Sequence, residues 1–149
     1  MSVCAFTGHR NLTNTDFDEL LLERVVENLI KTGTKRFLCG MAVGFDMKAA
    51  QAVIALKGKY DIELVACLPC ENQSARYSER NKTLYEEILS QCDEVITLAG
   101  GYVSGCMHRR DRYLVDNCDT VVSFLRKNSG GTYYTVNYAK KSSKKIIEL

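Results

Sequence analysis

The sequence contains little of what marks several common protein classes. Its only proline is Pro69, and no repeat, low-complexity tract or internal linker interrupts the 149 residues. No apolar run approaches the ~18 residues of a membrane-spanning helix, and the N-terminus lacks the basic segment and apolar stretch of a signal peptide. We therefore expect a single domain over residues 1–149, no membrane association and a cytoplasmic location.

The net charge is small, and histidine is scarce. The net charge is only +2, so any binding to nucleic acid would need a local basic patch. His9 and His108 are the only histidines, and Cys67 and Cys70 form the only Cys-x-x-Cys pair, so we expect no metal site. The odd number of cysteines, seven, favours reduced, mostly buried thiols over a disulfide framework. Redox catalysis by the Cys-x-x-Cys pair is a minor alternative.

Short β-rich apolar runs alternate with longer amphipathic segments. The expected strands are residues 3–6, 36–39, 62–68, 94–98, 120–125 and 145–149. The expected helices are residues 17–30, 45–56, 78–91, 106–117 and 132–141, the first preceded by a loose capping box at Thr15 and Asp18 and closed by Gly33. Because the strands are almost continuously apolar, they predict a mainly parallel sheet with helices on both faces. This pattern is typical of a doubly wound, Rossmann-like α/β domain.

The strand-to-helix junctions are the expected site of function, because such folds bind ligands beyond the carboxyl ends of their strands. Four junctions are unusual: Thr7-Gly8-His9-Arg10, the segment from Gly40 to Asp46 that includes Gly44, the segment from Pro69 to Gln73 that includes Glu71, and Ser129-Gly130-Gly131-Thr132. In the last of these, a glycine pair before a helix exposes backbone N–H groups to a phosphate. We expect the three glycine-bearing loops to converge on one phosphorylated ligand, although neither a dinucleotide fingerprint nor a Walker loop is present.

Five segments together carry a family resemblance. They are FTGHR (6–10), GMAVGFDMKAA (40–50), LPCENQ (68–73), RRDRYLVDNCD (109–119) and SGGTYYTVNYAKK (129–141). In this order they resemble the YpsA family, a bacterial branch of the SLOG superfamily of Rossmann-like nucleotide-binding domains. The superfamily includes LOG-type phosphoribohydrolases and the DprA proteins that bind single-stranded DNA. The resemblance implies a pocket for a nucleotide or nucleotide-derived ligand, and a homo-oligomer.

The chain also departs from its relatives. LOG-type hydrolases have a PGGxGTxxE motif, and the glutamate of that motif is absent from the segment between Ser129 and Val136. Where the YpsA pattern usually has Arg-Asn, this chain has Arg110-Asp111. We therefore expect a sensor or regulatory module that requires no cofactor, with nucleotide N-glycosidic hydrolysis as the alternative.

Individual roles follow from the chemistry of each side chain. Phosphate is expected on the backbone of Gly130, Gly131 and Thr132 and on Arg10 and Arg110, because a guanidinium matches phosphate oxygens in a bidentate fork. Thr7, Gly8, His9, Gly40, Gly44 and Ser129 are expected to line the ligand site. If the protein is an enzyme, the carboxylates available to it are Asp46, Asp116 and Glu71.

Single-strand binding is the alternative from another functional class. Arginines 109, 110, 112 and 126 and the lysines near the C-terminus could form a basic rim, and tyrosines 102, 113, 133 and 134 could stack on bases. A steep loss of affinity with salt would favour this alternative over a small-nucleotide pocket.

Overall fold

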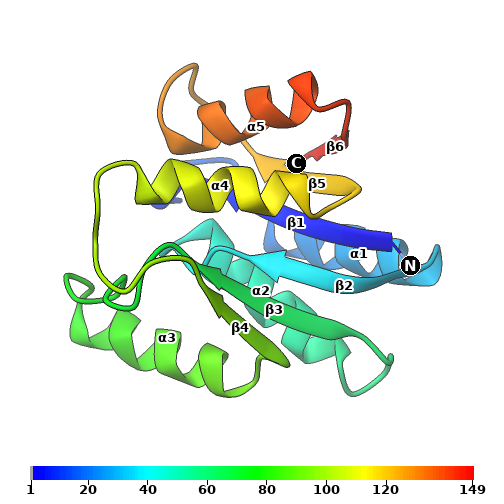
Figure 1. Cartoon of the computed structure of the whole chain (residues 1–149). Helices are drawn as coiled ribbons and strands as arrows, with labels where there is room; N and C mark the ends of the chain where they lie inside the picture. The colour runs from blue at the N-terminus through cyan, green and yellow to red at the C-terminus, as the bar shows by residue number, and fades with distance from the viewer. Residues whose placement is uncertain (1) are drawn as a thin grey trace.

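A six-stranded parallel sheet forms the centre of the protein, in the order β4-β3-β2-β1-β5-β6 (Figure 1). The computed structural model describes residues 2–149. The strands are β1 (Ser2–Gly8), β2 (Thr34–Cys39), β3 (Glu63–Leu68), β4 (Glu94–Thr97), β5 (Thr120–Phe124) and β6 (Lys145–Glu148). The helices are α1 (Glu19–Lys31), α2 (Phe45–Leu56), α3 (Glu79–Ser90), α4 (Cys106–Asp116) and α5 (Gly131–Lys141). The Rossmann-like α/β prediction is confirmed, and every strand pair is parallel.

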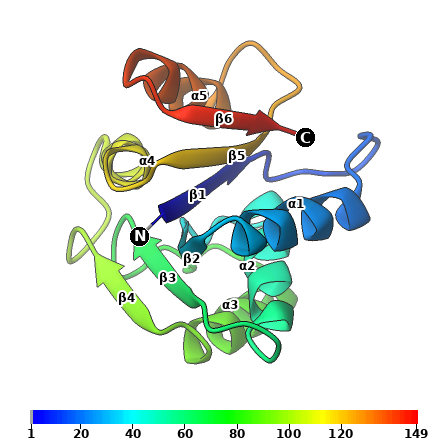
Figure 2. The ribbon, with the colours of Figure 1, turned by 90° about the vertical axis from the view of Figure 1, so that its right-hand side faces the viewer.

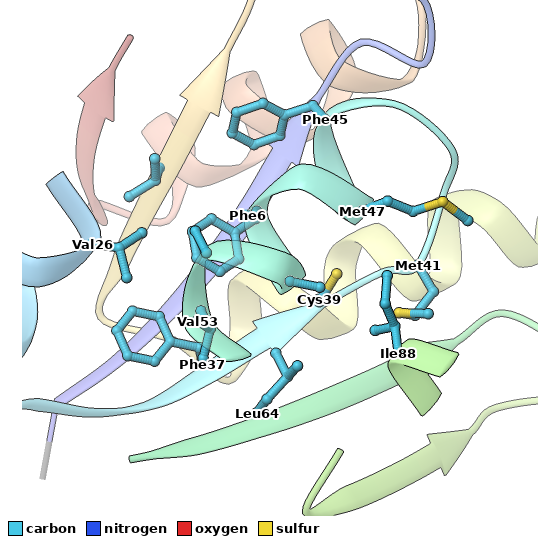
Figure 3. Close-up of a cluster of buried hydrophobic side chains, with 14 of the residues drawn as sticks. Phe6, Val26, Phe37, Cys39, Met41, Phe45, Met47, Val53, Leu64 and Ile88 are labelled. Carbon is cyan, nitrogen blue, oxygen red and sulfur yellow. The ribbon is translucent and has the colours of Figure 1, made fainter. Parts of the chain in front are cut away.

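The helices cover both faces of the sheet, as the nearly continuous apolar strands predicted. Helices α1, α2 and α3 lie on one face, and α4 and α5 lie on the other (Figure 2). The larger core lies under α1–α3, where Phe6 and Phe37 of neighbouring strands stack with ring centroids 5.8 Å apart (Figure 3). A smaller core lies under α4 and α5 and includes Ala5, Val65 and Leu114.

The start of the first helix differs from the expectation. Helix α1 begins at Glu19, and the Asp18 carboxylate caps it by accepting hydrogen bonds from the N–H groups of Leu20 (3.0 Å) and Leu21 (3.2 Å). The predicted capping box was therefore wrong, because the Thr15 hydroxyl instead donates to the Leu12 carbonyl at 2.6 Å. Phe17 lies before the helix and packs edge-on against Phe124.

Strands β1 and β5 lie side by side at the point where the strand order reverses. Thr7 pairs with Ser123 and Gly8 with Phe124, so the two strands end at the same height. From there the chain leaves β1 for the β2 side and leaves β5 for the β6 side. Such a reversal opens a crevice at the carboxyl edge of the sheet. Within residues 2–149, no helix has both the length and the apolar character needed to cross a membrane.

Candidate functional site

A cavity of about 270 Å³ lies at this reversal point. Its walls come from the loop after β1, the start of α2, one side of α4, and the loop that joins β5 to α5. Ten of the predicted site residues line it: Thr7, Gly8, His9, Arg10, Asp46, Arg110, Ser129, Gly130, Gly131 and Thr132. Four segments far apart in the sequence thus meet at one site.

Helix α5 opens into the cavity without a side-chain cap. Gly130 precedes it at φ 93°, in the region that favours glycine, and no side chain accepts from the first N–H groups of the helix. The first hydrogen bond along the helix runs from the Tyr134 N–H to the Gly130 carbonyl at 3.0 Å. By contrast, α1 and α3 are capped by Asp18 and Ser78. The N–H groups at the start of α5 are therefore available to an anion, and the helix dipole adds to their attraction. We call residues Ser129–Thr132 the α5 cradle.

Two exposed cations stand beside the α5 cradle. Arg10 and Lys127 line the cavity and take part in none of the ion pairs formed within residues 2–149. The neighbouring Arg126 is different, because its guanidinium binds the Asp16 carboxylate with an Nε–Oδ1 distance of 2.8 Å. Arg10 and Lys127 are thus the cations free to bind a ligand here.

His9 holds two loops together. Its Nε2 accepts a hydrogen bond of 2.7 Å from the Arg126 backbone N–H, and its ring packs edge-on against Phe124. Burial lowers the pKa of His9, and the charges of Lys127 and Arg126 lower it further. An imidazole that accepts at Nε2 carries its proton on Nδ1. His9 is therefore a neutral structural link between the loops after β1 and β5, at the wall of the cavity.

Three charged side chains form the buried floor of the cavity: Asp46, Arg110 and Asp111. Arg110 Nε donates to Asp111 Oδ1 at 2.8 Å, and Arg110 Nη1 donates to the Gly40 carbonyl. Burial raises the pKa of Asp46 to about 6, against the opposing effects of Arg110 and of the Ala42 N–H, which donates to its carboxylate at 3.2 Å. The Arg110 guanidinium is thus occupied by the Asp111 carboxylate and the Gly40 carbonyl, so less of it is available to phosphate than the sequence predicted.

Three of the predicted glycines are needed for packing within the protein. A Cβ at Gly8 would lie 2.3 Å from the Phe45 ring, and one at Gly40 would lie 2.8 Å from the Arg110 guanidinium. Gly44 has φ 82°, and a Cβ there would lie 2.2 Å from the Arg10 carbonyl oxygen. Gly40 and Gly44 do not line the cavity. These glycines bring protein segments together, whereas nothing lies within 4 Å of a Cβ at Gly130 or Gly131.

Glu71 and Asp116 lie outside the cavity. Glu71 is exposed in the turn after β3, where its N–H donates to the Ala99 carbonyl at 3.1 Å. Asp116 ends α4, and its carboxylate accepts from the Tyr138 hydroxyl at 2.8 Å. Because α4 starts near the carboxyl edge of the sheet, its last residue lies toward the opposite edge. Of the three proposed catalytic carboxylates, only Asp46 reaches the cavity.

Several lining residues were missed. Met107, His108, Asp111 and Leu114 of α4, together with Ala42 and Lys127, also line the cavity. Positions 107, 110, 111 and 114 follow the i, i+3, i+4, i+7 spacing of one helix face. That spacing could have identified α4 as a wall of the site.

The cysteines offer neither a metal site nor a reactive pair. All seven are free thiols and six are buried. Burial raises the pKa of Cys67 to about 12 and also raises the pKa of Cys70, so neither is a ready thiolate. Within residues 2–149, no three histidine, cysteine or acidic side chains gather as a potential metal site.

Comparison with known proteins supports a family assignment. Residues 7–148 match the model described as the YspA SLOG family, named YpsA. The prophage-derived protein YoqJ of Bacillus subtilis is 27% identical over 146 residues, covering 89% of this chain and 85% of YoqJ. The UPF0398 protein OB1025 of Oceanobacillus iheyensis is 26% identical, covering 97% of this chain and 85% of its own length.

Solved structures show the same fold. DNA processing protein A (DprA) of Streptococcus pneumoniae superposes with a TM-score of 0.73 at 18% identity, over 99% of this chain and 50% of that one. DprA of Helicobacter pylori, described as binding single-stranded DNA, superposes with a TM-score of 0.74 at 19% identity, over 99% of this chain and 64% of that one. The protein TM1055 superposes with a TM-score of 0.63 at 17% identity, over 98% of this chain and 72% of that one. The chain therefore spans less than two thirds of either DprA structure.

Proposed function

Since this chain belongs to the YpsA family of SLOG proteins, we propose that it binds a nucleotide, or a phosphorylated derivative of one, between β1 and β5 as a sensor or regulatory module. The observation that carries this proposal is the meeting of an uncapped helix N-terminus with two unpaired cations at one cavity.

The charges of the site favour a phosphate at its rim. The N–H groups of the α5 cradle would bind the phosphate oxygens, and Arg10 and Lys127 would neutralise them. The buried floor contains two carboxylates and one guanidinium, so its charge disfavours a phosphate there. Carboxylates accept hydrogen bonds from hydroxyl groups, so the floor suits the sugar of a nucleotide.

The test is calorimetric titration with the four nucleoside 5′-monophosphates, ADP-ribose and NAD. We expect Arg10→Ala and Gly131→Val each to weaken binding at least ~10-fold, through loss of a charge-assisted contact and through a side chain placed over the α5 cradle. Arg24→Ala is the matched control, because Arg24 is exposed on α1 and lies away from this cavity. Unchanged affinity in both site variants would refute the proposal.

Hydrolysis of the N-glycosidic bond is the second candidate, favoured by Asp46. Its carboxyl is buried in the cavity with a pKa of about 6, so near neutral pH it can take up or release a proton. Incubation with the ligand followed by mass spectrometry tests this reaction. Free base and sugar phosphate formed by the wild type, and not by Asp46→Asn, would establish the enzyme. Recovery of intact ligand would show that the protein binds the ligand without hydrolysing it.

Binding of single-stranded DNA has less support on this surface. Arg110 is buried and Arg126 is paired with Asp16, so the basic rim expected from sequence is interrupted. The likeness to DprA rests on fold, at 18% and 19% identity.

A further inference from the structure

A second cavity, of about 540 Å³, adjoins the first at the same edge of the sheet. Arg10 and Met107 line both. The remaining walls come from the turn after β3, the start of α3 and the loop before α4; they include Asn72, Arg76, Tyr77, Asn81 and Tyr102. A ligand that passes Arg10 can therefore extend from one cavity into the other.

The floor of the second cavity is fixed by internal hydrogen bonds. Gln73 Nε2 donates to the Gly40 carbonyl at 2.9 Å, and its Oε1 accepts from the Tyr85 hydroxyl at 3.0 Å. The Tyr77 hydroxyl donates to the Met41 carbonyl at 3.2 Å. These groups tie the turn after β3 to the loop after β2, so the cavity is preformed.

Other groups around this cavity remain free to bind. The side chains of Asn72, Arg76 and Asn81 form no hydrogen bond or ion pair among those found in residues 2–149. Tyr102 is 65% exposed, so its ring face is open. No aspartate or glutamate lines this cavity, in contrast to the first. Stacking faces, amide groups and cations without carboxylates suit a nucleobase and its linking phosphate.

We propose that the ligand is a dinucleotide, two nucleosides joined through phosphate, with one nucleoside in each cavity and Arg10 at the linkage. This inference rests on the proposed function and extends it. The first cavity, about 270 Å³, is small for a whole cofactor-sized ligand, since such pockets usually measure about 300–1,000 Å³. The second cavity supplies the missing room. Tyr102 stacks on the second base, Asn72 and Asn81 contact its edge, and Arg76 faces the phosphate.

The experiment compares calorimetric affinities for mononucleotides and dinucleotides. The probes are the four nucleoside 5′-monophosphates, the 5′-phosphorylated dinucleotide of each base, and diadenosine diphosphate, so both 3′–5′ and 5′–5′ linkages are represented. We expect a dinucleotide to bind about tenfold or more tightly than its mononucleotide. Tyr102→Ala and Arg76→Ala should each remove most of this gain and leave mononucleotide affinity unchanged. The control is Arg80→Ala, an exposed arginine four positions away that does not line either cavity.

The outcomes separate this inference from the proposed function. Mononucleotide binding that depends on Arg10, with no gain from a second nucleoside, would overturn the inference alone. Absence of binding by every probe would overturn both. A twelve-nucleotide single strand that binds tenfold or more tightly than any dinucleotide, with a steep salt dependence, would overturn it in favour of strand binding.

Discussion

The Nε2 atom of His9 accepts a hydrogen bond from the backbone N–H of Arg126, with 2.7 Å between the two nitrogens and 117 positions between the residues. This bond joins the loop that follows β1 to the loop that follows β5, where the strand order reverses. It also places the imidazole beside the cations of Arg126 and Lys127. The shape of the cavity therefore depends on a neutral His9.

The first prediction is a pH dependence of stability through His9. Its pKa in the folded protein lies below the ordinary value of 6.5. As the pH falls through 6.5, the unfolded chain therefore binds a proton at His9 more readily than the folded protein does. Stability from this group is thus present above pH 6.5 and lost on acidification. His9→Gln keeps an acceptor without a titrating ring. We expect the unfolding free energy of the wild type, relative to His9→Gln, to fall between about pH 7 and pH 5 in urea titrations. A constant difference would contradict the assignment.

The second prediction concerns Asp46, whose effect has the opposite sign. Its pKa is raised from 3.8 to about 6, so the folded protein holds its proton over a range in which the unfolded chain has released it. Stability should therefore fall as the pH rises from about 4 to about 6, by on the order of 3 kcal/mol. Asp46→Asn removes the titrating group, so the wild type should lose stability relative to it across that window. The same urea titrations measure this difference. If the unfolding free energies of the wild type and of Asp46→Asn changed in parallel with pH, the prediction would be wrong.

The alternation of strands and helices was predictable because burial on both faces leaves apolar runs and helical spacing in the sequence. Gly130 and Gly131 were also predictable as a helix start, since a local turn requires them. The roles of Gly8 and Gly40 were not, because the Phe45 ring and the Arg110 guanidinium that they accommodate lie far along the chain. The sequence predicts Arg110 as a phosphate clamp for the same reason: its burial and its pairing with Asp111 depend on how α4 packs on the sheet.

The third prediction follows from that burial. Arg110→Met keeps much of the side-chain volume but leaves the buried Asp111 and Asp46 carboxylates without the Arg110 cation, and it removes one of the two donors to the Gly40 carbonyl. We expect a loss of about 3–5 kcal/mol in unfolding free energy at neutral pH. Arg109→Met is the control, because Arg109 is the neighbouring arginine and its side chain is exposed. A loss below about 1 kcal/mol would mean that water already screens the floor.

The fourth prediction contrasts two glycines that line the same cavity. A Cβ at Gly8 would lie 2.3 Å from the fully buried Phe45 ring, so Gly8→Ala forces the ring to move, and we expect a loss of about 1–3 kcal/mol. A side chain at Gly131 meets open space, so Gly131→Val should change stability by no more than about 0.5 kcal/mol. Denaturant titration measures both. If Gly131→Val also abolishes nucleotide binding, the defect lies in access to the α5 cradle, because the fold is intact. If Gly131→Val is as unstable as Gly8→Ala, the start of α5 is a packing element, and its open N–H groups are no evidence for a phosphate site.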